Sequence, residues 1–216
     1  LLAHEELKPA AGLGPNFFNR FLFLGELALD GRLRPVSGVL SAALLAARRG
    51  LEGMFVPADN ATEAALVREL KVYPVQDLRQ LVAHLRCEEA IVAIPATDIQ
   101  YAPITREVDL GHIAGQDYAK RALLIAAAGS HNVLMHGPPG SGKTLLARAT
   151  AGILPQPTFE EMMDITRIYS VAGLLPSTTP LLTNRPFRSP HHSASAAALV
   201  GGGASVRPGE ITLAHR

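Results

Sequence analysis

The feature that most constrains the fold is a glycine-rich loop that follows the apolar stretch 131–136. The loop consists of Gly137, Pro138, Pro139, Gly140, Ser141, Gly142, Lys143 and Thr144. It carries every fixed residue of the pattern G-x-x-x-x-G-K-[ST], in which a strand enters the loop and a helix leaves it. We therefore predict a short buried strand over residues 131–136 and a helix that continues from Leu145. A chance glycine-rich turn is the alternative, and the flanking pattern disfavours it.

The residue types of this loop suit a nucleoside triphosphate. Three glycines lack a Cβ, so backbone N–H groups can approach phosphate oxygens closely. Lys143 is suited to carry positive charge to the β- and γ-phosphates, which is its expected catalytic role, and the Thr144 hydroxyl is suited to hold Mg²⁺. The start of the following helix adds a partial positive charge. We expect ATP and Mg²⁺ as ligands and residues 137–144 as the nucleotide-binding site.

Composition narrows the class of protein. A chain of 216 residues with 48% hydrophobic residues predicts one or two globular domains. The net charge of +1 gives no global argument for nucleic acid, so a polyanion site must be a local patch. The single cysteine, Cys87, excludes a disulfide framework and favours a cytoplasmic setting. No apolar run approaches the roughly 18 residues that a membrane span needs, so no membrane partner is expected.

The N-terminal part alternates predicted strands and helices, which is typical of an α/β unit. Strands are expected over residues 21–29, 33–36, 54–56 and 72–75, with a turn at Asp30-Gly31. Helices are expected over residues 39–49, closed by Gly50, over about 60–70, and over 78–85, capped by Asp77. Residues 87–108 are interpreted as a linker, within which residues 90–94 are considered as a strand.

The C-terminal part is expected to open at Asp109. Residues 109–116 match the segment before the first helix of many ring-forming ATPases, a resemblance that implies a place near the adenine base; a simple loop is the alternative. A helix is predicted from Gln116-Asp117 to Ala128, and another follows a capping box at Thr158 and Glu161.

A proline-punctuated basic stretch, residues 185–195, is the next informative segment. Arg185 and Arg188 are candidates for contacts with DNA phosphates, and Phe187 offers a face on which a base could stack. A solvated basic loop is the ordinary alternative. Metal binding by His191 and His192 is disfavoured, because neighbours on an extended chain point to opposite faces.

The chain resembles two known families along its length. Residues 1–86, with Gly25-Glu26-Leu27, Arg34-Pro35-Val36 and Val56-Pro57-Ala58-Asp59-Asn60, resemble the Lon-type protease domain. The position that matches the lysine of that peptidase is Leu40, which has no amine to act as a base, so we expect a catalytically inactive domain. The phosphate loop, residues 185–193, Gly201-Gly202-Gly203 and residues 207–216 resemble the magnesium-chelatase-like AAA+ ATPases of YifB or ComM type.

This resemblance implies an α/β architecture with a Lon-like α/β domain (1–86), a linker (87–108) and the first part of a P-loop AAA+ α/β/α parallel-sheet domain (109–216). It also implies ATPase activity and assembly into a homo-oligomeric ring such as a hexamer. For the ComM branch it implies a DNA-remodelling motor that drives branch migration, with DNA as its partner. The chain begins at Leu1 and ends at Arg216 inside a continuing element, so we expect a fragment. In the family the hydrolytic acidic residues follow the match to residues 214–216, so we expect the fragment to be hydrolysis-deficient. A metal-chelatase subunit and a nucleotide-gated scaffold without turnover are the alternatives.

Overall fold

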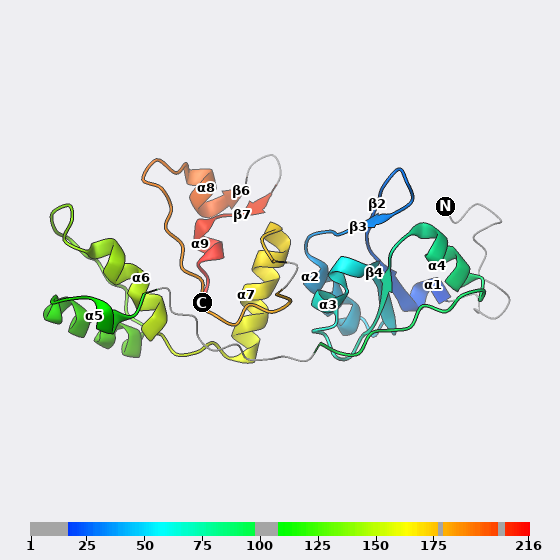
Figure 1. Cartoon of the computed structure of the whole chain (residues 1–216), viewed down its shortest axis with the longest axis horizontal. Helices are drawn as coiled ribbons and strands as arrows, with labels where there is room; N and C mark the ends of the chain where they lie inside the picture. The colour runs from blue at the N-terminus through cyan, green and yellow to red at the C-terminus, as the bar shows by residue number, and fades with distance from the viewer. Residues whose placement is uncertain (1–16, 98–107, 177–178, 203–205) are drawn as a thin grey trace. The chain divides into compact units, whose positions relative to one another are not determined.

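The computed structural model describes residues 17–97, 108–176, 179–202 and 206–216 (Figure 1). The chain divides into two compact units, one of residues 1–99 with 166–181 and the other of residues 100–165 with 182–216. Helix α7 (Phe159–Ala172) contributes residues to both units. Within the described ranges no helix is long and apolar enough to cross a bilayer.

The first unit is built around a parallel sheet of three strands in the order β1-β4-β5. These strands are β1 (Phe21–Phe23), β4 (Gly53–Pro57) and β5 (Lys71–Val75), and β4 is buried along its whole length. The connecting helices are α2 (Val39–Arg48) and α3 (Ala61–Ala64), while α1 (Phe17–Arg20) and α4 (Leu78–Leu85) flank the connections. A hairpin of β2 (Glu26–Leu27) and β3 (Leu33–Arg34) follows β1.

Aromatic side chains form the core on one face of this sheet. Phe55 stacks on Phe23 and on Tyr73, with ring centroids 4.9 and 4.7 Å apart, and Phe17 and Phe21 pack against the same cluster. Because side chains alternate along a strand, the neighbours of Phe55 in β4 point to the opposite face. Figure 1 shows α2 and α3 on one side of β4 and α1 and α4 on the other.

Several local signals in the sequence produce the elements that they predict. The Asp77 carboxylate accepts a hydrogen bond from the Gln80 N–H at 2.8 Å and so caps α4 at the predicted residue. Gly50 follows α2 with φ of +70°, a left-handed conformation that glycine adopts without strain. The turn at Asp30-Gly31 joins β2 to β3 as expected.

Other predicted elements are shorter or absent. The strand expected over residues 21–29 breaks at Leu24-Gly25, where β1 leaves the parallel sheet and the hairpin begins. Helix α3 ends at Ala64 rather than near Leu70, and turns fill the remainder. The strand considered at 90–94 reduces to one antiparallel bridge between Ile94 and Val72.

The second unit contains helices and a small ribbon. Its helices are α5 (Asp117–Gly129), α6 (Lys143–Ile153), α8 (Ala196–Val200) and α9 (Glu210–Leu213), with a 3₁₀ turn at Leu110–His112 and the start of α7. Strands β6 (Gly201–Gly202) and β7 (Arg207–Pro208) pair antiparallel. Among the residues described for 108–216 no parallel sheet is present, so the expectation of one in this part is not met.

The aromatic core contains one titratable group with a perturbed pKa. Burial against Phe55 lowers the pKa of His84 below its ordinary value, and the His84 Nδ1 atom accepts a hydrogen bond from the Ile91 N–H at 2.9 Å. Neutral imidazole is required for that bond, because a protonated ring has no acceptor nitrogen.

We predict that the free energy of unfolding of the first unit falls as pH decreases through 6.5. The unfolded chain takes up a proton near pH 6.5, whereas folded His84 resists it, so the contribution is present above 6.5 and is lost as pH falls through the lower folded pKa. Near-UV circular dichroism of the aromatic cluster during denaturation measures this. His84→Gln should flatten the pH dependence and His112→Gln, at an exposed site, should not; equal slopes in both variants would contradict the prediction.

Candidate nucleotide-binding site

The glycine-rich loop adopts a backbone that only glycine accepts readily. Gly140 and Gly142 have φ of +78° and +83°, both in the left-handed region. A Cβ built on either residue meets no atom within 4 Å. The requirement for glycine here is therefore conformational, and the space beside both residues is open to a ligand.

Helix α6 begins directly at Lys143, after Gly142 in the capping position. No side chain caps this end of the helix. The first N–H groups of a helix have no intrahelical acceptor, and they carry the positive end of the helix dipole. The predicted helix after the loop is thus confirmed, and its start is chemically suited to an anion.

The Lys143 side chain folds back across the loop. Its ammonium group donates to the carbonyl oxygens of Gly137 and Pro138 at 2.9 and 2.7 Å and lies 3.2 Å from the Ser141 hydroxyl. These three acceptors match the three donors of an ammonium group. A phosphate that reaches Lys143 must therefore replace at least one of these hydrogen bonds. Thr144 follows on the first turn of α6 with an exposed side chain.

A cavity of about 350 Å³ lies beside the loop. Gly137, Ser141 and Lys143 form its polar side, while Leu123 of α5 and Leu146 of α6 contribute apolar atoms. Gln116, whose backbone is left-handed with φ of +59°, also lines it and donates from Nε2 to the Ser141 carbonyl at 3.3 Å. The cavity therefore combines a charged end with an apolar wall, and one end of the segment 109–116 contacts the loop.

The buried strand predicted before the loop is wrong for the described structure. Residues 131–138 have no strand assignment, and the side chains of Val133 and Leu134 are 45% and 95% exposed. A strand is stabilised by pairing with a neighbour, and within the described residues none pairs with this segment. Residues 131–136 do have an apolar pattern, but the described residues include no strand with which this segment pairs.

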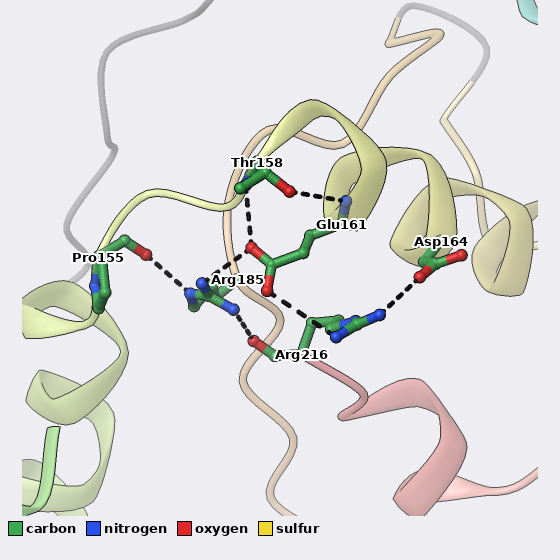
Figure 2. Close-up of polar contacts among 6 residues, drawn as sticks. All are labelled: Pro155, Thr158, Glu161, Asp164, Arg185 and Arg216. Carbon is green, nitrogen blue, oxygen red and sulfur yellow. Dashed lines mark hydrogen bonds and ion pairs between the residues drawn. The ribbon is translucent and has the colours of Figure 1, made fainter. Parts of the chain in front are cut away.

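Arg185 lies in a polar network at the start of α7 (Figure 2). Its guanidinium lies 3.1 Å from a Glu161 carboxylate oxygen and donates to the carbonyls of Pro155 and Arg216 at 2.8 and 2.5 Å. Arg216 in turn forms an ion pair of 2.9 Å with Asp164. This network joins three segments of the second unit through charged hydrogen bonds.

Glu161 is the centre of that network. It accepts from the Thr158 N–H at 2.9 Å and donates its own N–H to the Thr158 hydroxyl at 3.3 Å, which confirms the predicted capping box. The hydrogen bond from the Thr158 amide, with added attraction from Arg185, lowers the pKa of Glu161.

Arg188 is held by a second carboxylate. Two of its nitrogens contact the two oxygens of Glu210 at 2.5 and 2.6 Å, a bidentate arrangement. These hydrogen bonds lower the pKa of Glu210. Phe187, between the two arginines in sequence, is 37% exposed. The structure thus brings both candidate DNA-contacting arginines onto internal carboxylates, which the basic character of the stretch did not reveal.

His191 and His192 lie side by side, with ring centroids 4.0 Å apart, and His191 Nδ1 is 2.7 Å from the Ser193 hydroxyl. Among the described residues no group of three or more His, Cys, Asp or Glu side chains is placed to hold a metal ion.

We predict that Thr158→Ala lowers the free energy of unfolding by about 1 kcal/mol, because the Glu161 N–H loses its side-chain acceptor. Chemical denaturation followed by far-UV circular dichroism measures the change. Thr158→Ser keeps the hydroxyl and is the matched control. Equal losses for both variants would show that the capping hydroxyl is not the cause.

Comparison with known proteins places this site in a family. A family model described as "Magnesium chelatase, subunit ChlI" matches residues 109–216, and one described as "Subunit ChlI of Mg-chelatase" matches residues 9–60. An uncharacterised protein of Mycobacterium tuberculosis is 49% identical over 198 residues, which cover 90% of this chain and 39% of that protein.

Two further relatives match over nearly the whole chain. The YifB protein of Salmonella typhimurium is 41% identical over 215 residues, 100% of this chain and 41% of that protein. The competence protein ComM of Haemophilus influenzae is 43% identical over 216 residues, 94% of this chain and 40% of that protein. The chain spans about two fifths of the length of these relatives.

Similarity to Lon proteases is partial. The Lon protease of Rhizobium meliloti is 28% identical over 100 residues, which cover 44% of this chain and 12% of that protein. The match to the ChlI model covers half of the chain, and the YifB and ComM relatives confirm the resemblance found in the sequence. The chain belongs to the magnesium chelatase subunit ChlI family.

Proposed function

We propose that this chain binds ATP through residues 137–144. The observation that carries the proposal is the loop itself, which runs through two left-handed glycines into the uncapped start of α6 with Lys143 folded over it. A site built to hold an anion needs donors that converge on open space. The helix N–H groups and the vacant sides of Gly140 and Gly142 meet that need, and the Lys143 ammonium joins them when it exchanges a loop acceptor for the anion.

Each residue of the loop has a distinct part in this proposal. Lys143 exchanges loop carbonyls for phosphate oxygens and is the catalytic cation of the site. Gly137 and Ser141 bound the cavity in which the phosphates are held, and Pro138 and Pro139 stiffen the entry to the loop. Thr144 presents a hydroxyl suited to hold Mg²⁺, which supplies charge neutralisation to the triphosphate.

For the whole protein we propose an ATP-driven motor that acts on DNA. Support comes from membership of the family and from the likeness to a relative described as a competence protein. The protein would act as a cytoplasmic ring of identical subunits. In this proposal residues 1–86 form a Lon-like scaffold without peptidase activity, residues 87–108 a linker and residues 109–216 the start of the ATPase domain. Leu40, which replaces the peptidase lysine, is fully buried.

In this proposal fewer residues of the basic stretch, residues 185–195, are available to contact DNA than the sequence suggests. Arg185 and Arg188 are bound to Glu161 and Glu210, so their charge is offset within the chain. Phe187 has a partly exposed ring, which offers a stacking face for a base. We propose that the two arginines hold Phe187 in place and that they contact DNA only after exchanging their carboxylates.

A metal-chelatase subunit is the second candidate, favoured by the printed description of the matching family model. Such a protein would use the same ATP site, and its turnover would depend on a tetrapyrrole and a partner subunit rather than on DNA. Measuring ATPase activity with each substrate therefore separates the two.

We predict that Lys143→Ala weakens ATP binding roughly 10- to 100-fold, because a charged hydrogen bond to phosphate is lost. Titration of this chain with a fluorescent ATP analogue in the presence of Mg²⁺ gives the dissociation constant. Lys71→Ala removes an exposed lysine of β5 in the other unit and serves as the control. Unchanged affinity in Lys143→Ala would overturn the proposed role of the loop.

We predict that single-stranded DNA stimulates ATP turnover by the full-length protein. Phe187→Ala should weaken DNA binding about fivefold or more while ATP affinity is retained, because base stacking on an aromatic ring is lost. Phe187→Tyr keeps the ring and should bind DNA as the natural protein does. Turnover that is indifferent to DNA would refute the motor, and equal effects of Ala and Tyr would refute the stacking role.

A further inference from the structure

The first unit contains a larger cavity, of about 510 Å³, that the proposed nucleotide site does not use. It is formed by the loop before α2, by the 3₁₀ turn Ala58–Asn60 with α3, and by the last turn of α7 with the residues that follow it. We call it the acidic pocket and define it by Pro35, Ser37, Asp59, Glu63, Ser170 and Pro176. All of these residues belong to the same compact unit.

The charge of the acidic pocket is one-sided. Among the residues that the structure describes, Asp59 and Glu63 are the charged side chains that line it, and no lysine, arginine or histidine does so. A carboxylate removed from water is stabilised by a cation or by hydrogen bonds, and this described lining supplies no cation.

Glu63 is the residue that points to a ligand. It is 7% exposed, and its Oε1 atom accepts from the Leu40 N–H at 2.9 Å and from the Ser170 hydroxyl at 2.5 Å. The structure gives its second carboxylate oxygen no hydrogen-bond partner among the described residues. In the same residues no fully enclosed side-chain oxygen or nitrogen lacks a partner, so this second oxygen is not fully enclosed, and Glu63 lines the pocket.

The other residues that line the pocket indicate the chemistry of the rest of the ligand. Pro35, Pro176 and Pro180 present apolar surface to the cavity, and Ser37 presents a hydroxyl. An apolar stem with a charged tip is the kind of ligand that packs on such a surface while its tip reaches a carboxylate. The volume is in the range of small-molecule sites.

We propose that the acidic pocket binds an alkylammonium group, with the ammonium on the free oxygen of Glu63 and the stem against the prolines. Asp59, whose side chain is exposed, provides a second negative charge at the pocket. The group can belong to a free diamine or to a lysine side chain of a polypeptide, since both present the same chemistry. This site is independent of ATP binding at residues 137–144.

The test measures binding to this chain by isothermal titration calorimetry with three ligands. Nα-acetyl-lysine methylamide carries the ammonium on a peptide-like backbone, cadaverine carries it on a free stem, and Nα-acetyl-norleucine methylamide has a similar stem without it. We expect the two ammonium ligands to bind and the norleucine ligand not to. Tighter binding of the lysine derivative assigns the pocket to a polypeptide, and tighter binding of cadaverine assigns it to a free amine.

Variants connect the binding to the pocket. Glu63→Gln retains an oxygen for the Leu40 and Ser170 donors but places an amide NH₂ where the free oxygen lies, so affinity for the ammonium ligands should fall about tenfold or more. Glu69→Gln makes the same change at an exposed site and should bind normally. If Glu63→Gln fails to fold, Asp59→Asn decides, with a smaller expected loss.

The proposal is overturned by three results. The first is the absence of ammonium binding at millimolar ligand. The second is equal binding of the lysine and norleucine ligands. The third is a lysine affinity unchanged in both Glu63→Gln and Asp59→Asn.

Discussion

The left-handed turn at Gly140 and Gly142 is the constraint on which the second unit's chemistry depends. It lets the chain reverse and enter α6 with unpaired N–H groups at its start, and it leaves open space where a side chain would otherwise stand. Lys143 is fixed by the same turn, because its ammonium reaches the carbonyls of Gly137 and Pro138 only when the loop is closed. The ammonium of Lys143 is therefore already hydrogen-bonded within the loop. An anion that binds there competes with the loop carbonyls for this one cation.

Local chemistry made much of the fold predictable from the sequence. Asp77, Gly50 and the pair Thr158 and Glu161 act on backbone groups within a few residues, so their effect is decided before any tertiary contact forms. The helix after the phosphate loop follows from the same kind of signal. Sheet membership is different, because a strand exists only through its neighbour. Residues 133–135 have an apolar pattern and no described partner, and residues 21–29 divide between two sheets.

The candidate site was predictable to the same extent. The identity of the loop residues is visible in the sequence, and the structure adds the cavity and the contact with Gln116. What the sequence concealed is long-range pairing of charge. Arg185 and Glu161 are 24 residues apart and Arg188 and Glu210 are 22 apart, so no local rule joins them. Glu63 likewise meets Ser170 across 107 residues, and both residues line the acidic pocket.

Pro74 lies in β5, one of the two edge strands of the parallel sheet, and it affects how this edge can pair with other polypeptide chains. Val72 uses its outward carbonyl to receive the Ile94 N–H, and alternation along β5 turns Pro74 to that same outer side. Proline has no N–H to offer there, so the bridge at Ile94 cannot grow into a full extra strand. Pro74 therefore blocks the addition of a further strand along this edge of the sheet. Strand addition between molecules is a route to aggregation, and the proline disfavours it here.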